Sequence, residues 1–233
     1  MKHRVLASMM ACAGLALLGY GLVAAAAPGK HPGIFSPNSR PFGHTYAEWS
    51  ARYWQWGLGL PGDADHPFLD SSGFDVTDGQ SGEVWFLASP FGTVQRTCTI
   101  PADTALFVGM LNSEWSSLEG FPTEQEQTDT AIYFGDHIVD LSCTLDGMPV
   151  ENLGAFRFLS PQFTFSAPTP WIFGATGGTG TAVADGYYVF LKPMDAGPHV
   201  LHYSGAFLFT VADDGFDFYL PLDMTYNLTQ LDD

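Results

Sequence analysis

The feature that most restricts the fold of this chain is a series of short segments in which apolar and polar residues alternate. In residues 94–100, Val94, Cys98 and Ile100 share one parity, and polar residues fill the other. Such alternation is typical of a strand with one buried face. Comparable segments span residues 83–89, 104–111, 155–165, 186–193, 197–211 and 223–231. These short strands and the turn signals between them predict a mainly β fold, an antiparallel β-sandwich of jelly-roll or immunoglobulin-like type with two short helices.

The first helix is predicted to begin after Thr45, because Thr45 and Glu48 have the spacing of a capping box. Its aromatic face consists of Tyr46, Trp49, Tyr53 and Trp56. We expect this face to pack on the sheet, and a stacking platform for sugar rings is the alternative. Trp54 lies off the face and is the candidate exposed ligand contact. Arg52, one turn after Glu48, is expected to pair with it.

A second helix is expected over residues 124–139, with Thr123 as N-cap and Glu126 completing a capping box. His137, in the last turn, is expected to bond to the carbonyl groups that end the helix. Asp146 and Gly147, between two apolar segments, predict a tight hairpin turn.

The N-terminus has the pattern of a secretory signal peptide. Lys2, His3 and Arg4 precede an apolar run that ends in small residues near position 26. We therefore divide the chain into a signal peptide (residues 1–26), an extended leader (residues 27–42) and a single domain (residues 43–233). The protein is expected to be exported, to the periplasm or the medium.

The chain is acidic, with 25 Asp and Glu residues against eight Lys and Arg residues. This charge disfavours binding to nucleic acid or to anionic lipid. Beyond the signal peptide no apolar run is long enough for membrane insertion. A glycan or a cationic partner fits better, and an acidic surface that only maintains solubility is the plainer interpretation.

Two cysteines remain after the signal peptide, Cys98 and Cys143. In an oxidising compartment two such cysteines are expected to form a disulfide. Acidic residues also crowd the loop after the first helix, where Asp63, Asp65 and Asp70 offer the oxygen ligands that calcium prefers. No other cofactor is expected.

Several stretches resemble an uncharacterised family of exported bacterial proteins. They include GHTYAEWSARYWQW, RTCTIPADTALF and GPHVLHYSG. The resemblance implies an exported bacterial protein and no particular activity. It also places cysteines of relatives at the positions of Val76 and Trp115, so a second disulfide is not expected here.

No nucleophile elbow, HExxH motif or dinucleotide-binding fingerprint occurs in the chain. If the protein is an enzyme, Glu114 and His202 are the first catalytic candidates. His199 and His202 are three apart, so on a regular strand they point to opposite faces and do not share a metal ion. His202 shares the parity of Val200, and we expect one of the two histidines to be buried and the other to be on the surface.

Three functions fit these observations. The first is an exported non-catalytic binding or envelope protein, with glycans as candidate ligands and Trp54, His44 and Asn112 as candidate contacts. The second is a metal-assisted hydrolase that uses Glu114, His199 and His202. The third is a structural subunit assembled through exposed strand edges.

Overall fold

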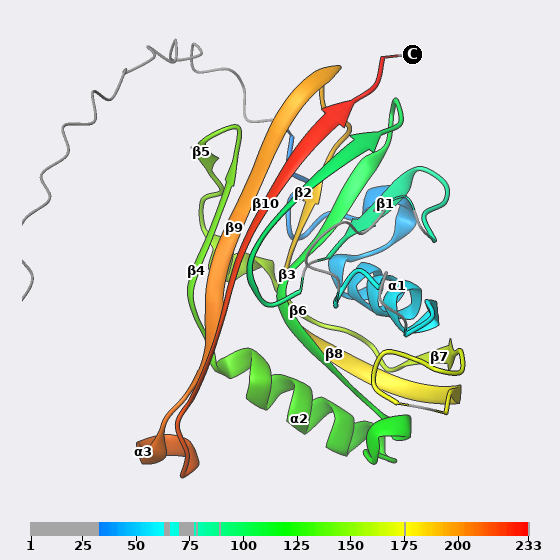
Figure 1. Cartoon of the computed structure of the whole chain (residues 1–233), viewed down its shortest axis with the longest axis vertical. Helices are drawn as coiled ribbons and strands as arrows, with labels where there is room; N and C mark the ends of the chain where they lie inside the picture. The colour runs from blue at the N-terminus through cyan, green and yellow to red at the C-terminus, as the bar shows by residue number, and fades with distance from the viewer. Residues whose placement is uncertain are drawn as a thin grey trace, which may run out of the picture.

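Two five-stranded sheets make up most of the computed structural model, which describes residues 33–62, 66–69, 77, 79–88, 90–174 and 176–232. The first sheet runs in the order β1 (Val84–Leu87), β3 (Ala105–Ser116), β8 (Gly178–Leu191) and β6 (Arg157–Leu159), with β7 (Phe163–Ala167) also paired to β8. The second runs β2 (Gly92–Ile100), β10 (Phe218–Gln230), β9 (Gly197–Phe209), β4 (Ile138–Leu145) and β5 (Met148–Pro149). The predicted β-sandwich with short helices is confirmed (Figure 1).

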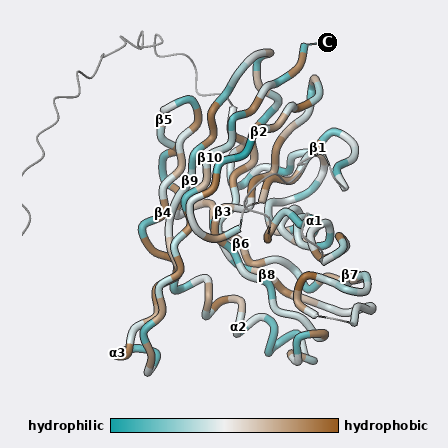
Figure 2. The backbone as a smooth tube through the Cα atoms, in the orientation of Figure 1, coloured by the Kyte–Doolittle hydropathy of each residue, from teal (hydrophilic) through white to brown (hydrophobic). Residues whose placement is uncertain are grey.

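The two sheets are mixed in orientation rather than wholly antiparallel. β1 pairs with β3 in parallel, and β2 pairs with β10 in parallel. The reason is that the chain alternates between sheets: β2, which lies between β1 and β3 in sequence, belongs to the second sheet. Hydrophobic and hydrophilic residues alternate along β9 and β10, because one face of this sheet is buried against the core (Figure 2).

Helix α1 (Tyr46–Gly59) begins with the predicted capping box of Thr45 and Glu48. Its aromatic face is core: Trp49 is 7% exposed and Tyr53 is 1% exposed. Both rings contact Phe107 of β3, at 6.2 Å between centroids. The packing interpretation of this face is therefore the one that the structure supports.

Trp54 is also buried, with 6% of its surface exposed, so its expected exposure is wrong. The residues after the helix fold back over it, and Phe68 lies 5.0 Å from the Trp54 ring. On its other side the indole N–H donates to the Tyr188 hydroxyl at 3.2 Å. Because α1 is covered on two sides, its buried surface is wider than the predicted aromatic face.

Helix α2 (Glu124–Asp136) has the predicted capping box of Thr123 and Glu126, but it ends earlier than expected because β4 begins at Ile138. It crosses the lower end of the molecule in Figure 1, against β8 and β3. His137 Nδ1 bonds to the Tyr133 carbonyl at 2.6 Å, as expected for a helix end. A short third helix, α3 (Val211–Asp214), was not predicted and joins β9 to β10. Single 3-10 turns are η1 (Pro41–Gly43), η2 (Ser117–Glu119) and η3 (Leu153–Phe156).

An ion pair lies beneath α2. Asp185 of β8 is 2% exposed, and Arg157 of β6 donates to its Oδ2 from Nε at 2.9 Å. Arg157 Nη1 also reaches the exposed Asp136 at 2.7 Å. Gly135 of α2 rests directly on this pair, and a Cβ there would collide with both Asp185 and Arg157.

Part of the predicted leader belongs to the domain. Ile34 forms a bridge with Leu191 of β8, and Phe35 N donates to the Phe190 carbonyl at 2.9 Å. The Tyr46 hydroxyl donates to the Phe35 carbonyl at 2.6 Å. The domain therefore begins before residue 43. The predicted signal peptide lies outside the described residues.

The predicted Cys98–Cys143 disulfide is not formed in the structure, and both cysteines are buried. Cys98 lies on β2 and Cys143 on β4, and strands β10 and β9 separate them in the second sheet. Three strand spacings amount to about 14 Å. A disulfide needs Cα atoms within about 7 Å, so no bond can form without rearranging the sheet.

We expect both thiols to be inert in the folded protein and reactive after unfolding. Burial raises the pKa of the Cys143 thiol to about 12, so little thiolate exists near neutral pH. Mass spectrometry after iodoacetamide treatment without reductant should find no labelled cysteine in native protein and both labelled in denaturant. A linked Cys98–Cys143 peptide in unreduced protein would contradict this result.

Candidate functional site

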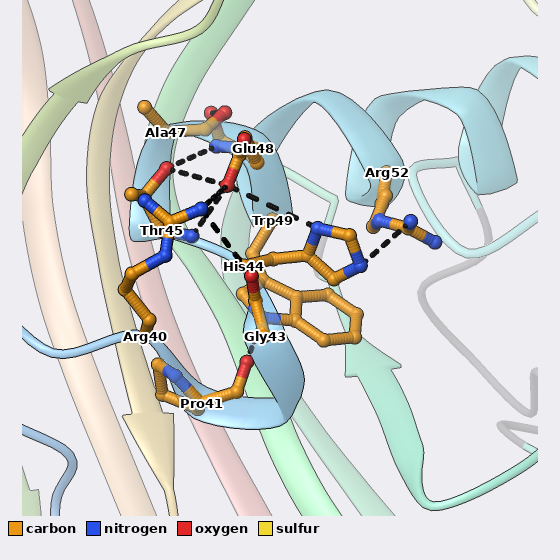
Figure 3. A network of polar contacts seen from close by, with 10 residues as sticks. Arg40, Pro41, Gly43, His44, Thr45, Ala47, Glu48, Trp49 and Arg52 are labelled. Atoms are coloured by element: carbon orange, nitrogen blue, oxygen red, sulfur yellow. Dashed lines mark hydrogen bonds and ion pairs between the residues drawn. The ribbon is translucent and has the colours of Figure 1, made fainter.

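The polar residues at the start of α1 form a network that caps the helix (Figure 3). Thr45 N donates to Glu48 Oε2 at 2.7 Å, and Arg40 Nη2 lies 3.3 Å from the same oxygen. The predicted Glu48–Arg52 pair is wrong, because Arg52 Nη2 instead lies 2.9 Å from His44 Nε2. Hydrogen bonds from Thr45 lower the pKa of the Glu48 carboxyl. These side chains, His44 included, are engaged with one another.

His199 and His202 point to opposite faces of β9, in agreement with the parity argument. His199 Nδ1 lies 2.7 Å from Asp146 Oδ2, and its side chain is 14% exposed. His202 faces outward like Val200, with its side chain 37% exposed and Nε2 2.9 Å from Asp223 Oδ1. Each histidine therefore has its own carboxylate partner, and neither is close to complete burial.

A largely apolar cavity of about 220 Å³ lies along β3, between the two sheets. We call it the β3-edge cavity. Its lining combines α1, β3, η2, α2, β9 and β10 with two loop residues: Trp54, Phe91, Asn112, Ser113, Glu114, Trp115, Glu119, Phe134, Phe173, Phe207, Phe209, Phe218 and Leu220. Phe91 and Phe173 are each 46% exposed and form its rim.

The cavity exists because β3 is much longer than its neighbour β1. β1 pairs with β3 only as far as Val108, whereas β8 accompanies β3 to Ser116. Four consecutive β3 residues, 112–115, line the cavity. Since successive side chains of a strand point to opposite faces, a cavity that touches all four lies along the edge of the strand.

Glu114 is the most unusual residue of the β3-edge cavity. It is 4% exposed, and neither carboxyl oxygen makes a well-formed hydrogen bond within the described part of the chain. Its polar neighbours are Glu119 and Ser116, whose weaker hydrogen bonds to the Glu114 carboxyl group contribute to the shift of its pKa. The Ser116 hydroxyl also donates to Glu119 Oε2 at 2.6 Å. Burial and the nearby Glu119 carboxyl raise the pKa of Glu114 well above its ordinary range. Burial also raises the pKa of Glu119.

We expect Glu114→Gln to stabilise the protein at neutral pH. Because the folded pKa of Glu114 is above the unfolded value of 4.5, the folded state keeps a proton that the unfolded chain releases. The free energy of unfolding therefore falls as pH rises above 4.5, by at most about 1.4 kcal/mol per pH unit. The Gln substitution removes this pH dependence. Urea unfolding at several pH values between 4.5 and neutral pH measures the difference in free energy of unfolding between the two proteins. The control is Glu151→Gln at an exposed position. A Glu114→Gln protein that is less stable throughout would contradict the prediction.

Two further polar groups of the cavity lining have no hydrogen-bond partner among the described residues. They are the Ser113 hydroxyl and the Trp115 indole N–H, and both atoms are buried. Buried polar atoms are nearly always paired, so each exception calls for an explanation such as a ligand or ordered water. These two donors flank the buried Glu114 carboxyl group on one strand edge, and this edge is therefore the candidate site.

A second apolar cavity of about 180 Å³ adjoins the first. Trp54, Phe91, Asn112 and Phe173 line both. Its remaining walls are mainly hydrophobic and include Phe68, Met110, Ile172 and Leu222. The two cavities together offer an elongated apolar space with the carboxyl groups at one end.

The structure therefore brings three of the predicted site residues to one place. Trp54, Asn112 and Glu114 line the β3-edge cavity, whereas His44 lies in the α1 network and His202 lies on the outer face of β9. Glu119 and the phenylalanines of the lining were missed. The phenylalanines come from distant parts of the chain, and Glu119, close to Glu114 in sequence, belongs to no recognisable motif. The predicted calcium ligands Asp63, Asp65 and Asp70 lie outside the described residues.

Within the described residues no group of three or more His, Cys, Asp or Glu side chains could hold a metal ion. None of the helices in that part of the chain is both long and apolar enough to span a membrane. The chain matches no protein-family model, no curated protein and no solved structure. The assignment of a function therefore depends on the chemistry of the site itself.

Proposed function

We propose that this chain is an exported, non-catalytic binding protein for a small molecule with an apolar body and one polar group. The observation that carries the proposal is the buried carboxyl group of Glu114, which forms no ion pair with a described residue, in a largely apolar cavity. Binding sites for small molecules are concave, mostly apolar and equipped with a few polar groups that orient the ligand. Export is proposed from the signal-peptide pattern of residues 1–26.

Several features favour binding over hydrolysis. The two histidines of the hydrolase hypothesis lie on opposite faces of β9, each with its own carboxylate. The nearest ionisable neighbour of Glu114 is another carboxyl group, Glu119. A glycan is a less suitable ligand than an apolar molecule, because a sugar presents many hydroxyl groups and the lining pairs few of them.

We expect the neutral fluorophore N-phenylnaphthylamine to bind to the protein and to emit more strongly when bound. The Phe91→Ala/Phe173→Ala double variant should bind it at least tenfold more weakly, a loss of about 1.4 kcal/mol in binding free energy. Both side chains form the rim and are about half exposed, so their removal should leave the fold intact. Fluorescence titration measures the affinity, and energy transfer from Trp54 and Trp115 reports proximity.

Tyr219→Ala is the matched control, because Tyr219 is an aromatic residue of β10 that is 59% exposed and does not line the cavity. It should bind the fluorophore like the unaltered protein. Equal loss of binding in both variants, or no binding by the unaltered protein, would contradict the proposed function.

A further inference from the structure

The charged side chains that line the β3-edge cavity are of one sign. Two of its lining residues are acidic, Glu114 and Glu119, and none is basic. Both carboxyl groups belong to the same short stretch of chain at the end of β3 and in η2. An anionic ligand would therefore meet carboxyl groups without any compensating positive charge, which is unfavourable in an apolar site.

Aromatic rings make up most of the remaining lining, including both tryptophans Trp54 and Trp115. The face of an aromatic ring carries negative electrostatic potential and attracts cations, with tryptophan the strongest. Sites for organic ammonium ions commonly combine several rings in this way. An apolar ligand of no charge would gain from burial alone and would leave Glu114 without a cationic partner.

From these observations, and resting on the proposed function, we infer that the ligand is an organic ammonium ion whose charged group lies beside Glu114 and whose apolar body extends into the neighbouring cavity. The cation would supply the positively charged partner that Glu114 lacks among the described residues. The acidic surface of the chain, with a formal net charge of −17, would also raise the local concentration of cations.

Binding of such a ligand would be coupled to the release of a proton. In the empty site Glu114 is surrounded by Glu119 of η2 and Tyr188 of β8, while Asp185 of β8 is neutralised by Arg157. These surroundings favour the neutral carboxyl group. A neighbouring cation favours the carboxylate. Binding would therefore transfer the Glu114 proton to solvent as the ammonium ion enters, and one positive charge replaces another in the site.

The experiment compares three probes of similar size by displacement of N-phenylnaphthylamine: benzyltrimethylammonium, its neutral isostere neopentylbenzene, and the anion phenylacetate. We expect the cation to bind about tenfold more tightly than the neutral isostere and the anion to bind most weakly. Isothermal titration calorimetry of the cation in two buffers of different ionisation enthalpy should register proton release at neutral pH.

Glu114→Gln should reduce the affinity for the cation to that for the neutral isostere and abolish the proton release. Glu151→Gln, at an exposed position away from the cavity lining, should preserve the preference. If the neutral isostere binds as tightly as the cation, the cation inference is wrong and the proposed function stands. If neither the probes nor the fluorophore binds, both are wrong.

Discussion

Trp49→Ala is expected to lower the free energy of unfolding by about 3 to 5 kcal/mol, the usual cost of deleting a buried aromatic side chain. Trp49 is 7% exposed and its ring lies 5.3 Å from Phe190 and 6.2 Å from Phe107. Its indole N–H donates to the Pro41 carbonyl at 2.9 Å, so the substitution also leaves a buried acceptor unpaired. Urea unfolding followed by circular dichroism measures the change.

Tyr219→Ala again provides the control, because it removes an aromatic ring that is mostly exposed. It should change the free energy of unfolding by less than about 0.5 kcal/mol. If Trp49→Ala unfolds at the same urea concentration as the unaltered protein, then α1 does not pack on the first sheet as described.

Arg157→Met should be destabilising by a comparable amount, about 3 to 5 kcal/mol, because it leaves the buried Asp185 without its cationic partner. Asp185 is 2% exposed, so water cannot replace the lost guanidinium group without opening the structure. Met preserves much of the volume of the aliphatic part of Arg157 and limits the cavity that is formed. Chemical unfolding at neutral pH measures the effect.

The second carboxylate bound by Arg157 supplies the internal comparison. The Asp136 side chain is 58% exposed, and Asp136→Asn should cost less than about 1 kcal/mol. Similar losses in both variants would mean that the exposed pair, and not the buried one, holds Arg157 in place.

The local elements of this fold could be predicted from the sequence because their signals are local. Thr45 with Glu48 and Thr123 with Glu126 mark helix starts, and both capping boxes form. Asp146 and Gly147 have the positive φ angles of a tight hairpin turn, as expected. The opposite orientations of His199 and His202 follow from strand parity alone.

The pairing of distant strands could not be predicted in this way. Nothing near Cys98 indicates that two strands separate it from Cys143, and the expected disulfide failed for that reason. Likewise, the burial of Trp54 depends on Phe68 folding back over the helix. Glu114 was singled out as a polar residue at a strand end, but the aromatic residues that share its cavity come from strands and helices far from it in sequence.

The parallel pairing of β2 with β10 has a consequence for the order of folding. Val94 pairs with Met224, so the second sheet joins residues about as far apart as the domain permits. Contacts of such long sequence separation slow folding, because the intervening chain must be ordered before they form. β2 cannot pair within the second sheet until β10 has been synthesised. A nascent chain would leave β2 without its partner until then, and a chain truncated before Phe218 would leave one face of its core unclosed.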